Sequence, residues 1–172
     1  QAAHMAARGD AWAAASQDHD SLLFGAPRMV KNLTISGKRK LPRRQAYVEV
    51  EPEVVELKEV LADLGLTREQ LVEVGILIGT DYNPDGVKGI GPKTALKLIR
   101  ESGSLKVIVA KTPDLALPGN VDRIRQFFLT PDVRSDYMLN WRKTNPGEVV
   151  DFLCKERDFS EDRVRKALER ME

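Results

Sequence analysis

The sequence has only one cysteine and no long apolar run. Cys154 alone allows no intrachain disulfide and no cysteine-ligated metal cluster, which is typical of a reducing compartment, so we expect cytosol or nucleoplasm. No stretch approaches the roughly 20 apolar residues that a membrane-spanning helix requires. The first residues also lack the apolar segment of a secretory signal peptide. We therefore expect neither export nor a membrane location.

A marked excess of charge of either sign is also missing. The chain has 27 Lys and Arg residues against 26 Asp and Glu residues, which gives a formal net charge of +1. Binding to a polyanion must therefore come from the local placement of charge. The chain begins at Gln1 without an initiating Met, and its first residues are typical of the end of a helix stopped by Gly9. We expect a part of a longer protein.

Two regions of different pattern follow. Residues 11–16, "AWAAAS", predict a short buried strand, and the alternating residues 28–35 predict another. A basic loop at residues 36–44 leads to a predicted returning strand at 46–50. We predict an α/β fold in which residues 1–50 are the end of a sheet domain with a basic hairpin loop. Residues 51–172 are predicted to be a largely helical region, packed as one unit.

Helical periodicity begins at Pro52. Helix-start signals are Thr67, which forms a capping-box pattern with Gln70, and Ser160, which Phe159 and Val164 flank as a hydrophobic staple. Glycines at positions 65 and 79 predict helix ends. The predicted helices are residues 52–64, 67–78, 92–101, 121 to near 131, and 160 onward, while residues 105–110 fit strand and helix equally well.

The most specific pattern is residues 87–99, "VKGIGPKTALKLI". Its spacing, apolar-x-Gly-apolar-Gly-x-x-x-Ala-x-x-apolar-apolar, is typical of a helix-hairpin-helix. Gly89 and Gly91 allow positive φ and close approach of a ligand, and Ala95 lets two helices pack closely. The N–H groups at the start of the following helix, with Lys93 beside them, favour a phosphate. This pattern predicts sequence-nonspecific binding to a DNA backbone, against the alternative of a turn that only joins two helices.

Three aspartates stand near this pattern or follow a predicted strand. Asp18 and Asp20 are two residues apart, so in extended geometry both face one side of the chain. Such a pair is also typical of an ordinary loop, but Asp81 adds a third carboxylate at the exit of a buried helix. Divalent cations such as Mg²⁺ prefer carboxylate oxygens. Carboxylates beside a phosphate-binding turn predict metal-assisted hydrolysis of a phosphodiester.

Other polar and aromatic residues favour structural roles. His4 and His19 are not at a spacing typical of metal ligands, and Cys154 is typical of a small core residue. We interpret Trp141 and Phe152 as packing residues. A basic run suits either a solvated loop or further phosphate contacts, and the pattern does not decide between them. It consists of Lys38, Arg39, Lys40, Arg43 and Arg44.

Three segments together resemble one family. They are "ASQDHDSLLFGAPRMVKNLTISGKRKLP", "LVEVGILIGTDYNPDGVKGIGPKTALKLI" and "FLCKERDFSEDRVRKALER". The chain resembles the C-terminal half of the archaeal form of flap endonuclease, in the XPG/flap endonuclease family of structure-specific 5′ nucleases. The resemblance implies a mostly parallel 5′ nuclease (PIN-like) sheet flanked by helices. It implies 5′ flap endonuclease and 5′–3′ exonuclease action on DNA in replication and repair, in the cytoplasm of an archaeal cell or in a eukaryotic nucleus.

The resemblance also assigns roles to residues. It implies that three aspartates bind one of two Mg²⁺ ions, that four residues of the helix-hairpin-helix bind DNA, and that two backbone carbonyls bind a monovalent cation, K⁺. The three aspartates are Asp18, Asp20 and Asp81. The DNA-binding residues are Gly89, Gly91, Lys93 and Thr94, and the two carbonyls are those of Val87 and Ile90.

The partners implied by the resemblance are a 5′-flap or nicked duplex DNA, a sliding clamp, and the N-terminal half of the enzyme. The family's other metal-binding carboxylates, its helical arch and its sliding-clamp motif are absent from this sequence, so we expect this chain alone to be inactive. The alternative is a noncatalytic helix-hairpin-helix module that binds DNA backbone. A sibling exonuclease or excision nuclease also stays open.

Overall fold

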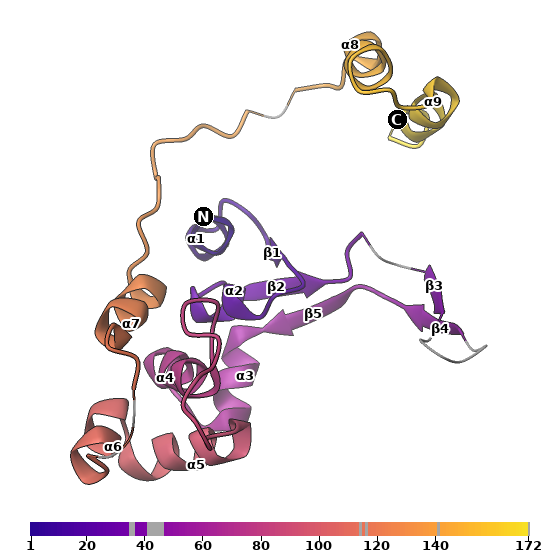
Figure 1. The fold of residues 1–172 in the computed structure, drawn as a ribbon. Coiled ribbons are helices and arrows are strands. Elements are labelled where there is room, and N and C mark those ends of the chain that lie inside the picture. Colours follow the sequence, from indigo (N-terminus) through magenta and orange to yellow (C-terminus); the bar gives the residue numbers. More distant parts are fainter. Residues whose placement is uncertain (35–36, 41–46, 114, 116, 141, 172) are drawn as a thin grey trace. The chain divides into compact units, whose positions relative to one another are not determined.

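A computed structural model describes the chain except for residues 35–36, 41–46, 114, 116, 141 and 172 (Figure 1). Its contacts divide the chain into two compact units, Gln1–Arg134 and Ser135–Glu172. This division differs from the predicted boundary after residue 50, because strand β5 (Glu53–Glu56) continues the sheet that begins upstream. It also differs from the predicted packing of residues 51–172 as one unit, since the break falls after Arg134.

The sheet of the first unit has three strands in the order β1, β2, β5. Strands β1 (Ala14–Ala15) and β2 (Arg28–Lys31) are parallel, whereas β2 and β5 are antiparallel. Strands β3 (Gly37–Lys40) and β4 (Tyr47–Val50) form a separate antiparallel pair. The predicted buried strand and the strand from residue 28 are confirmed in shorter form. Among the described residues the pairing is mixed, so the mostly parallel sheet of the family is not evident in them.

Two expectations about this region were wrong. The predicted returning strand pairs with β3 and not with β2, whose antiparallel partner is β5. Residues 53–56 were expected to begin a helix, but they form β5, and helix α3 (Leu57–Leu64) begins only after them. The sheet explains the difference, because Val55 lies opposite Met29 and packs against a buried cluster that contains it. Of the predicted basic loop, residues 37–40 form β3, while Arg43 and Arg44 lie outside the described residues.

The other helices of the first unit follow the predicted start and stop signals. Gly9 and Gly65 end helices in the left-handed conformation, and Thr67 and Gln70 form the predicted capping box. The ambiguous residues 105–110 are helical, with Ser104 as N-cap. These helices are α1 (Ala2–Arg8), α2 (Asp20–Leu23), α4 (Arg68–Ile78), α5 (Pro92–Ser102), α6 (Leu105–Lys111) and α7 (Val121–Leu129).

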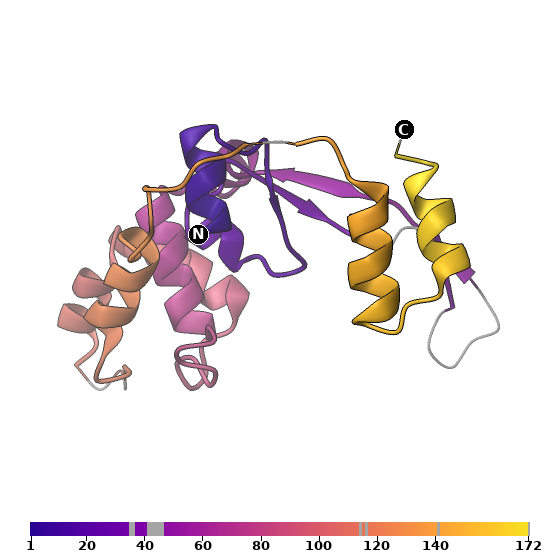
Figure 2. The same ribbon diagram turned by 90° about the horizontal axis from the view of Figure 1, so that it is seen from above.

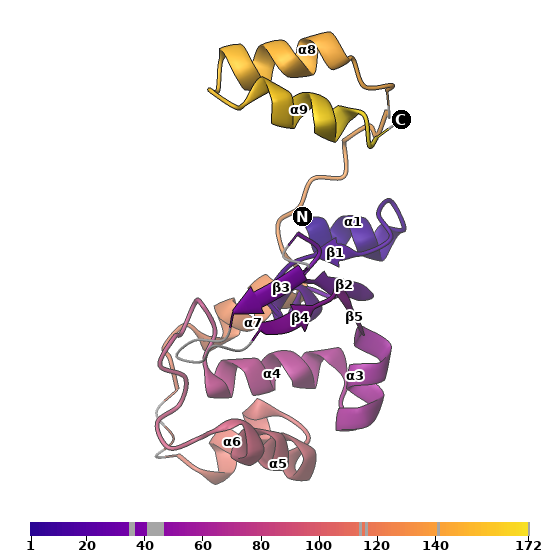
Figure 3. The same ribbon diagram turned by 90° about the vertical axis from the view of Figure 1, so that its right-hand side faces the viewer.

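Helix α4 lies at the centre of the first unit, between the sheet and helices α5 and α6 (Figures 1 and 3). Val72, Ile76 and Leu77 on α4 are fully buried, as are Ala95 on α5 and Phe128 on α7. The small side chain at position 95 brings α5 close to α4, as the sequence predicted. The main core therefore surrounds α4, and the chain segments before and after α4 converge on its ends.

One charged side chain is buried in this core. Glu73 on α4 is 3% exposed. Its Oε1 accepts a hydrogen bond from Arg125 Nε on α7 at 3.0 Å, and its Oε2 accepts one from the backbone N–H of Leu105 on α6 at 2.9 Å. A buried carboxylate is stable only when its oxygens are paired in this way. Glu73 therefore joins three helices around one charge.

The second unit consists of α8 (Pro146–Val150), the π-helical turn η1 (Asp151–Lys155) and α9 (Glu161–Leu168). Helices α8 and α9, orange and yellow in Figure 2, lie side by side with Val150 and Val164 buried. Ser160 is the N-cap of α9 as predicted, but among the described residues its side chain accepts no capping hydrogen bond. Phe159 is 58% exposed, so most of the proposed staple residue faces solvent.

The expectation for Phe152 was wrong. This residue was expected to pack in a core but is half exposed, with the guanidinium of Arg157 over its ring at 5.1 Å. Met171 is also exposed. Trp141 lies outside the described residues. Within the described part of the chain, every helix is too short or too polar to cross a lipid bilayer.

Replacing Glu73 with Ala tests the buried ion pair. The change leaves the Arg125 guanidinium and the Leu105 N–H without their acceptor, so we expect the free energy of unfolding to fall by about 3 kcal/mol. Urea denaturation followed by circular dichroism measures it. Glu101→Ala is the matched control, because Glu101 forms an exposed pair with Lys97 on α5 and its loss costs at most about 0.5 kcal/mol. Equal losses in the two variants would contradict a structural role for Glu73.

Candidate metal centre

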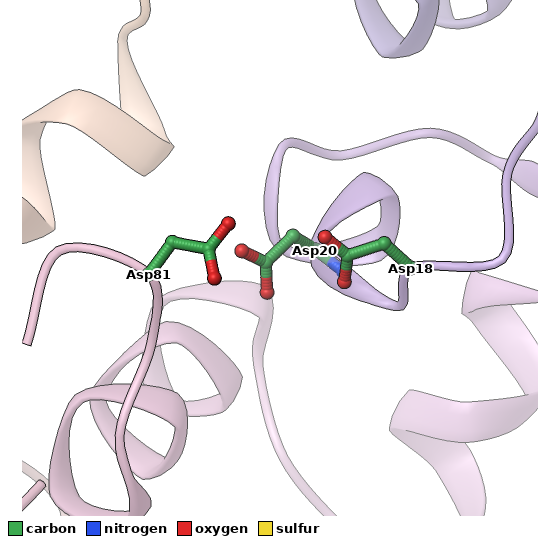
Figure 4. A group of neighbouring side chains, drawn as sticks. All are labelled: Asp18, Asp20 and Asp81. Carbon is green, nitrogen blue, oxygen red and sulfur yellow. The ribbon is translucent and has the colours of Figure 1, made fainter. Parts of the chain in front are cut away.

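Three carboxylates meet at one point of the first unit. Asp18 follows β1, Asp20 is the first residue of α2, and Asp81 follows α4. One oxygen of each lies within 4.8 Å of the others. Figure 4 shows Asp81 and Asp20 pointing toward one another, with Asp18 beside Asp20. The predicted gathering of these three side chains is therefore confirmed, although they are up to 63 positions apart in sequence (81 − 18).

The chain turns sharply between the first two aspartates. The backbone N–H of Ser16 bonds Val30 O at 3.0 Å and ties the end of β1 to β2. The N–H of Asp18 then donates to Ser16 Oγ, and the N–H of Asp20 donates to Asp18 Oδ1, each at 3.0 Å. The expected extended geometry was wrong here, because short polar side chains bond the backbone two residues on and favour turns. The turn, followed by α2, brings the two carboxylates together.

Asp81 is held by a turn that needs two glycines. Gly79 ends α4 with φ of 112°, and Gly86 has φ of 56°. A Cβ on Gly79 would lie 2.7 Å from Pro84 O, and one on Gly86 would lie 2.6 Å from the carbonyl carbon of Ile78. The backbone segments on the two sides of this turn therefore touch directly, and only glycine fits at either position.

A buried polar pair fixes the same turn from inside. Thr80 and Asn83 are each 8% exposed. Thr80 Oγ1 donates to Asn83 Oδ1 at 2.7 Å, and Asn83 Nδ2 donates to Ile76 O on α4 at 2.7 Å. The N–H of Tyr82 donates to Thr80 Oγ1 at 3.2 Å. Thr80 and Tyr82, on the two sides of Asp81, are therefore joined through Asn83 to the end of α4. Thr80 and Asn83 were not predicted from the sequence, although polar residues that flank an aspartate before a Pro-Asp-Gly turn are a usable signal.

The surroundings of Asp20 disfavour its ionised form. Burial, followed by the negative charges of Asp18 and Asp81, raises the pKa of Asp20, and His19 opposes this shift. A divalent cation placed among the oxygens would replace this repulsion by attraction. A donor set made only of carboxylates suits hard cations such as Mg²⁺, Mn²⁺ and Ca²⁺. The residues present therefore fit a divalent metal.

The glycine pattern before α5 has the expected shape in part. Gly89 has φ of 82°, but Gly91 has φ of −93° because it is the N-cap of α5 in extended conformation. The expectation of positive φ was therefore wrong at Gly91. A Cβ on either glycine would meet nothing within 4 Å, so their backbone is open to a ligand. Lys93 and Thr94 are exposed in the first turn of α5, where backbone N–H groups have no intrahelical acceptor.

Comparison with known proteins identifies the family. The family model "XPG I-region" matches residues 1–81, which include all three aspartates. Flap endonuclease 1 of Staphylothermus marinus is 54% identical to this chain over 171 residues, and that of Hyperthermus butylicus is 57% identical over 171 residues. In both cases the match covers 99% of this chain. The chain belongs to the flap endonuclease family.

Solved structures agree with this assignment. The structure of flap endonuclease-1 from Methanococcus jannaschii is 40% identical in sequence to this flap endonuclease family chain and superposes on it with a TM-score of 0.77. The match covers 98% of this chain and 48% of the Methanococcus jannaschii chain. The catalytic core of Rad2 in complex with a DNA substrate, 19% identical, has the same fold with a TM-score of 0.75. The chain spans about half the length of the curated relatives it matches. The placement of this chain in the C-terminal half of such a protein stays a prediction.

Replacing Asp20 with Asn tests the repulsion in the acidic cluster. The folded state raises the pKa of Asp20 above its value of 3.8 in the unfolded chain, so an ionised Asp20 lowers the stability of the fold. We expect metal-free Asp20→Asn to melt at a higher temperature than the parent at pH 7. The gain should vanish below about pH 4, where both states of the parent hold the proton.

Added Mg²⁺ separates repulsion from other causes of a higher melting temperature. Mg²⁺ should raise the melting temperature of the parent chain, because it binds only the folded state, and should raise that of Asp20→Asn much less. Asp85→Asn serves as control, since this exposed aspartate lies outside the cluster. An equal response to Mg²⁺ in the parent and in Asp20→Asn would argue against Asp20 as a ligand.

Proposed function

We propose that this chain is part of a Mg²⁺-dependent, structure-specific 5′ nuclease that hydrolyses a DNA phosphodiester near the base of a 5′ flap. The observation that carries the proposal is the acidic cluster, whose three oxygens lie within 4.8 Å of one another. Support comes from relatives named Flap endonuclease 1 that are 54% and 57% identical over nearly the whole chain.

Asp18, Asp20 and Asp81 would hold one Mg²⁺ ion. When bound, such an ion supplies activation of water and neutralises charge on the departing oxygen. The chain itself contributes rigid placement of the ligands, through the α2 turn and through the Thr80–Asn83 pair. A second ion roughly 4 Å away would need further carboxylates. Among the described residues there is one such acidic group, so we propose that the rest of the protein completes the site and that this chain alone is inactive.

Residues 79–101 are proposed to form a helix-hairpin-helix that binds duplex DNA through its backbone. Helices α4 and α5 pack closely around Ala95, and Ile90 packs against the main core between the two glycines. Gly89 and Gly91 leave the backbone open, while Lys93 and Thr94 stand at the start of α5. N–H groups and a cation at a helix N-terminus suit a phosphate and read no base.

A monovalent cation, K⁺, is proposed at the same turn, bound by the backbone carbonyls of Val87 and Ile90. The Val87 carbonyl accepts one hydrogen bond, from the N–H of Ile90 at 3.0 Å, and a carbonyl oxygen has a second lone pair for a cation. The sliding clamp as a partner stays a prediction of the resemblance.

The competing proposal is a noncatalytic module that only binds DNA backbone. Such a module has no use for three mutually repelling carboxylates, one of which has a raised pKa. The acidic cluster therefore favours the nuclease.

Asp81→Ala in the whole parent protein tests the catalytic assignment. We expect cleavage of a 5′-flap substrate in Mg²⁺ to fall by at least about a thousandfold, because a metal ligand is lost. Substrate affinity, measured by fluorescence anisotropy in Ca²⁺, should change less than about threefold, because the glycine turn is intact. Asp85→Ala is the control. A variant at position 81 that still cleaves at the parent rate would refute the metal-ligand role.

Lys93→Ala tests the proposed DNA-binding turn. Loss of one phosphate contact should weaken duplex binding and reduce the slope of log K against log salt by about 0.9. Lys97→Ala is the control, because Lys97 lies one turn further along α5 and pairs with Glu101. Binding titrations at four or more salt concentrations give both slopes, and an unchanged slope for Lys93→Ala would count against the phosphate contact.

A further inference from the structure

A hollow opens next to the turn that carries Asp81. It has a volume of about 310 Å³, within the range of small-molecule sites. One wall is Tyr82, the residue that follows Asp81, and the other is the start of α7. The residues from the α7 side are spaced i, i+3, i+4 and i+7, so they share one helix face. They are Asn120, Arg123, Ile124 and Phe127.

Aromatic rings form the walls of this hollow. The ring centroid of Tyr82 is 4.7 Å from that of Phe127 and 5.6 Å from that of Phe128. Phe128 is fully buried and also contacts Phe24, so the visible rings are supported by the core. Tyr82 and Phe127 are nevertheless 47% and 41% exposed. Two half-exposed rings held in fixed orientation offer flat apolar area to a ligand that stacks.

The polar residues of the hollow suit an anion. Arg123 is exposed in the first turn of α7, and no ion pair of Arg123 occurs in the part of the chain that the structure describes. A cation in the first turn opposes the helix dipole, so its position does not serve the stability of α7. Asn120 is the N-cap of α7, yet its side chain accepts no capping hydrogen bond from the described residues. A cation, an amide and helix N–H groups therefore border the aromatic rings.

We propose that this hollow binds one unpaired nucleotide of a DNA single strand. The base stacks on the ring of Tyr82 with its edge toward Phe127, whose ring is inclined at 62° to that of Tyr82, and the phosphate lies against Arg123 and the start of α7. Every base has an aromatic face, so such a site tolerates any sequence. A base inside a duplex is already covered on both faces by its neighbours, so the site selects unpaired nucleotides.

The inference rests on the proposed nuclease function, because a nucleotide held here lies next to Asp81. Tyr82 directly follows Asp81 in the chain, so a nucleotide stacked on its ring is held by the same turn that carries the metal ligand. Holding the unpaired strand beside the cluster would orient the neighbouring phosphodiester for hydrolysis. Tyr82 and Arg123 are thus assigned to substrate positioning, separately from the helix-hairpin-helix, which binds duplex.

The test is a metal-free binding measurement on this chain in EDTA, where no cleavage occurs. The probe is a short DNA single strand that contains 2-aminopurine, whose fluorescence is quenched when it stacks. Tyr82→Ala should weaken single-strand binding about tenfold and abolish the protein-induced quenching. Tyr82→Phe should bind like the parent, because only the ring is needed. Arg123→Ala should lower the salt slope for the single strand by about 0.7.

The controls separate the nucleotide site from general effects. Phe159→Ala and Arg163→Ala remove an exposed ring and an exposed cation in the second unit and should leave binding unchanged. Duplex of the same sequence should bind Tyr82→Ala and the parent chain equally. An abasic strand lacks the base that stacks, so its affinity for the parent chain should be as low as its affinity for Tyr82→Ala. Unchanged single-strand binding in Tyr82→Ala, or equal losses for duplex and single strand, would overturn the proposal.

Two outcomes distinguish this inference from the proposed function. Cleavage by Asp81→Ala in the whole parent protein would refute the metal role but leave the metal-free stacking result standing. Conversely, a parent protein that cleaves through Asp81 but shows no 2-aminopurine quenching would refute the nucleotide site alone. The quenching assay is therefore repeated on the whole protein, where loss of the signal overturns the assignment for the complete enzyme.

Discussion

The burial of α4 on nearly all its faces is the constraint on which the rest of the first unit depends. Its fully buried residues pack against α5, α7 and α2, so α4 has no freedom to rotate or slide without opening the core. The proposed sites sit at the C-terminal end of this fixed helix. Asp81 follows it directly, Asp20 lies on α2 against it, and the glycine turn leads from it into α5.

The acidic cluster shows how such a scaffold holds groups that repel. Burial and the two neighbouring carboxylates raise the pKa of Asp20, so its ionised form lowers the stability of the fold. The cost is tolerated because two separate turns fix the ligands: Asp18 and Asp20 are held by bonds within one turn, and Asp81 by Thr80 and Asn83 in another. Functional sites commonly retain local conflicts of this kind, and the surrounding structure offsets them.

Local patterns in the sequence predicted what depends on local physics. The capping box at Thr67, the glycine helix ends and the start of α5 were read correctly, because each depends on a few neighbouring residues. Strand β5 was missed because its valines also fit the face of the helix that follows, and its pairing with β2 is non-local. Glu73 was hidden inside an apolar run, since its partner Arg125 lies 52 residues away. The three aspartates were found from their positions after a predicted strand and a buried helix, but their mutual distance required the fold.

The ion pair between Glu73 and Arg125 has a consequence beyond stability. Arg125 lies on α7, two residues from Arg123 and two from Phe127, while Glu73 lies on the helix that ends just before Asp81. Any displacement of α7 away from α4 would leave a carboxylate in the core without its cation, which is strongly unfavourable. The distance between the hollow and the acidic cluster is therefore fixed in the protein before DNA binds. Such a preset spacing favours selection of DNA by its shape over induced fit.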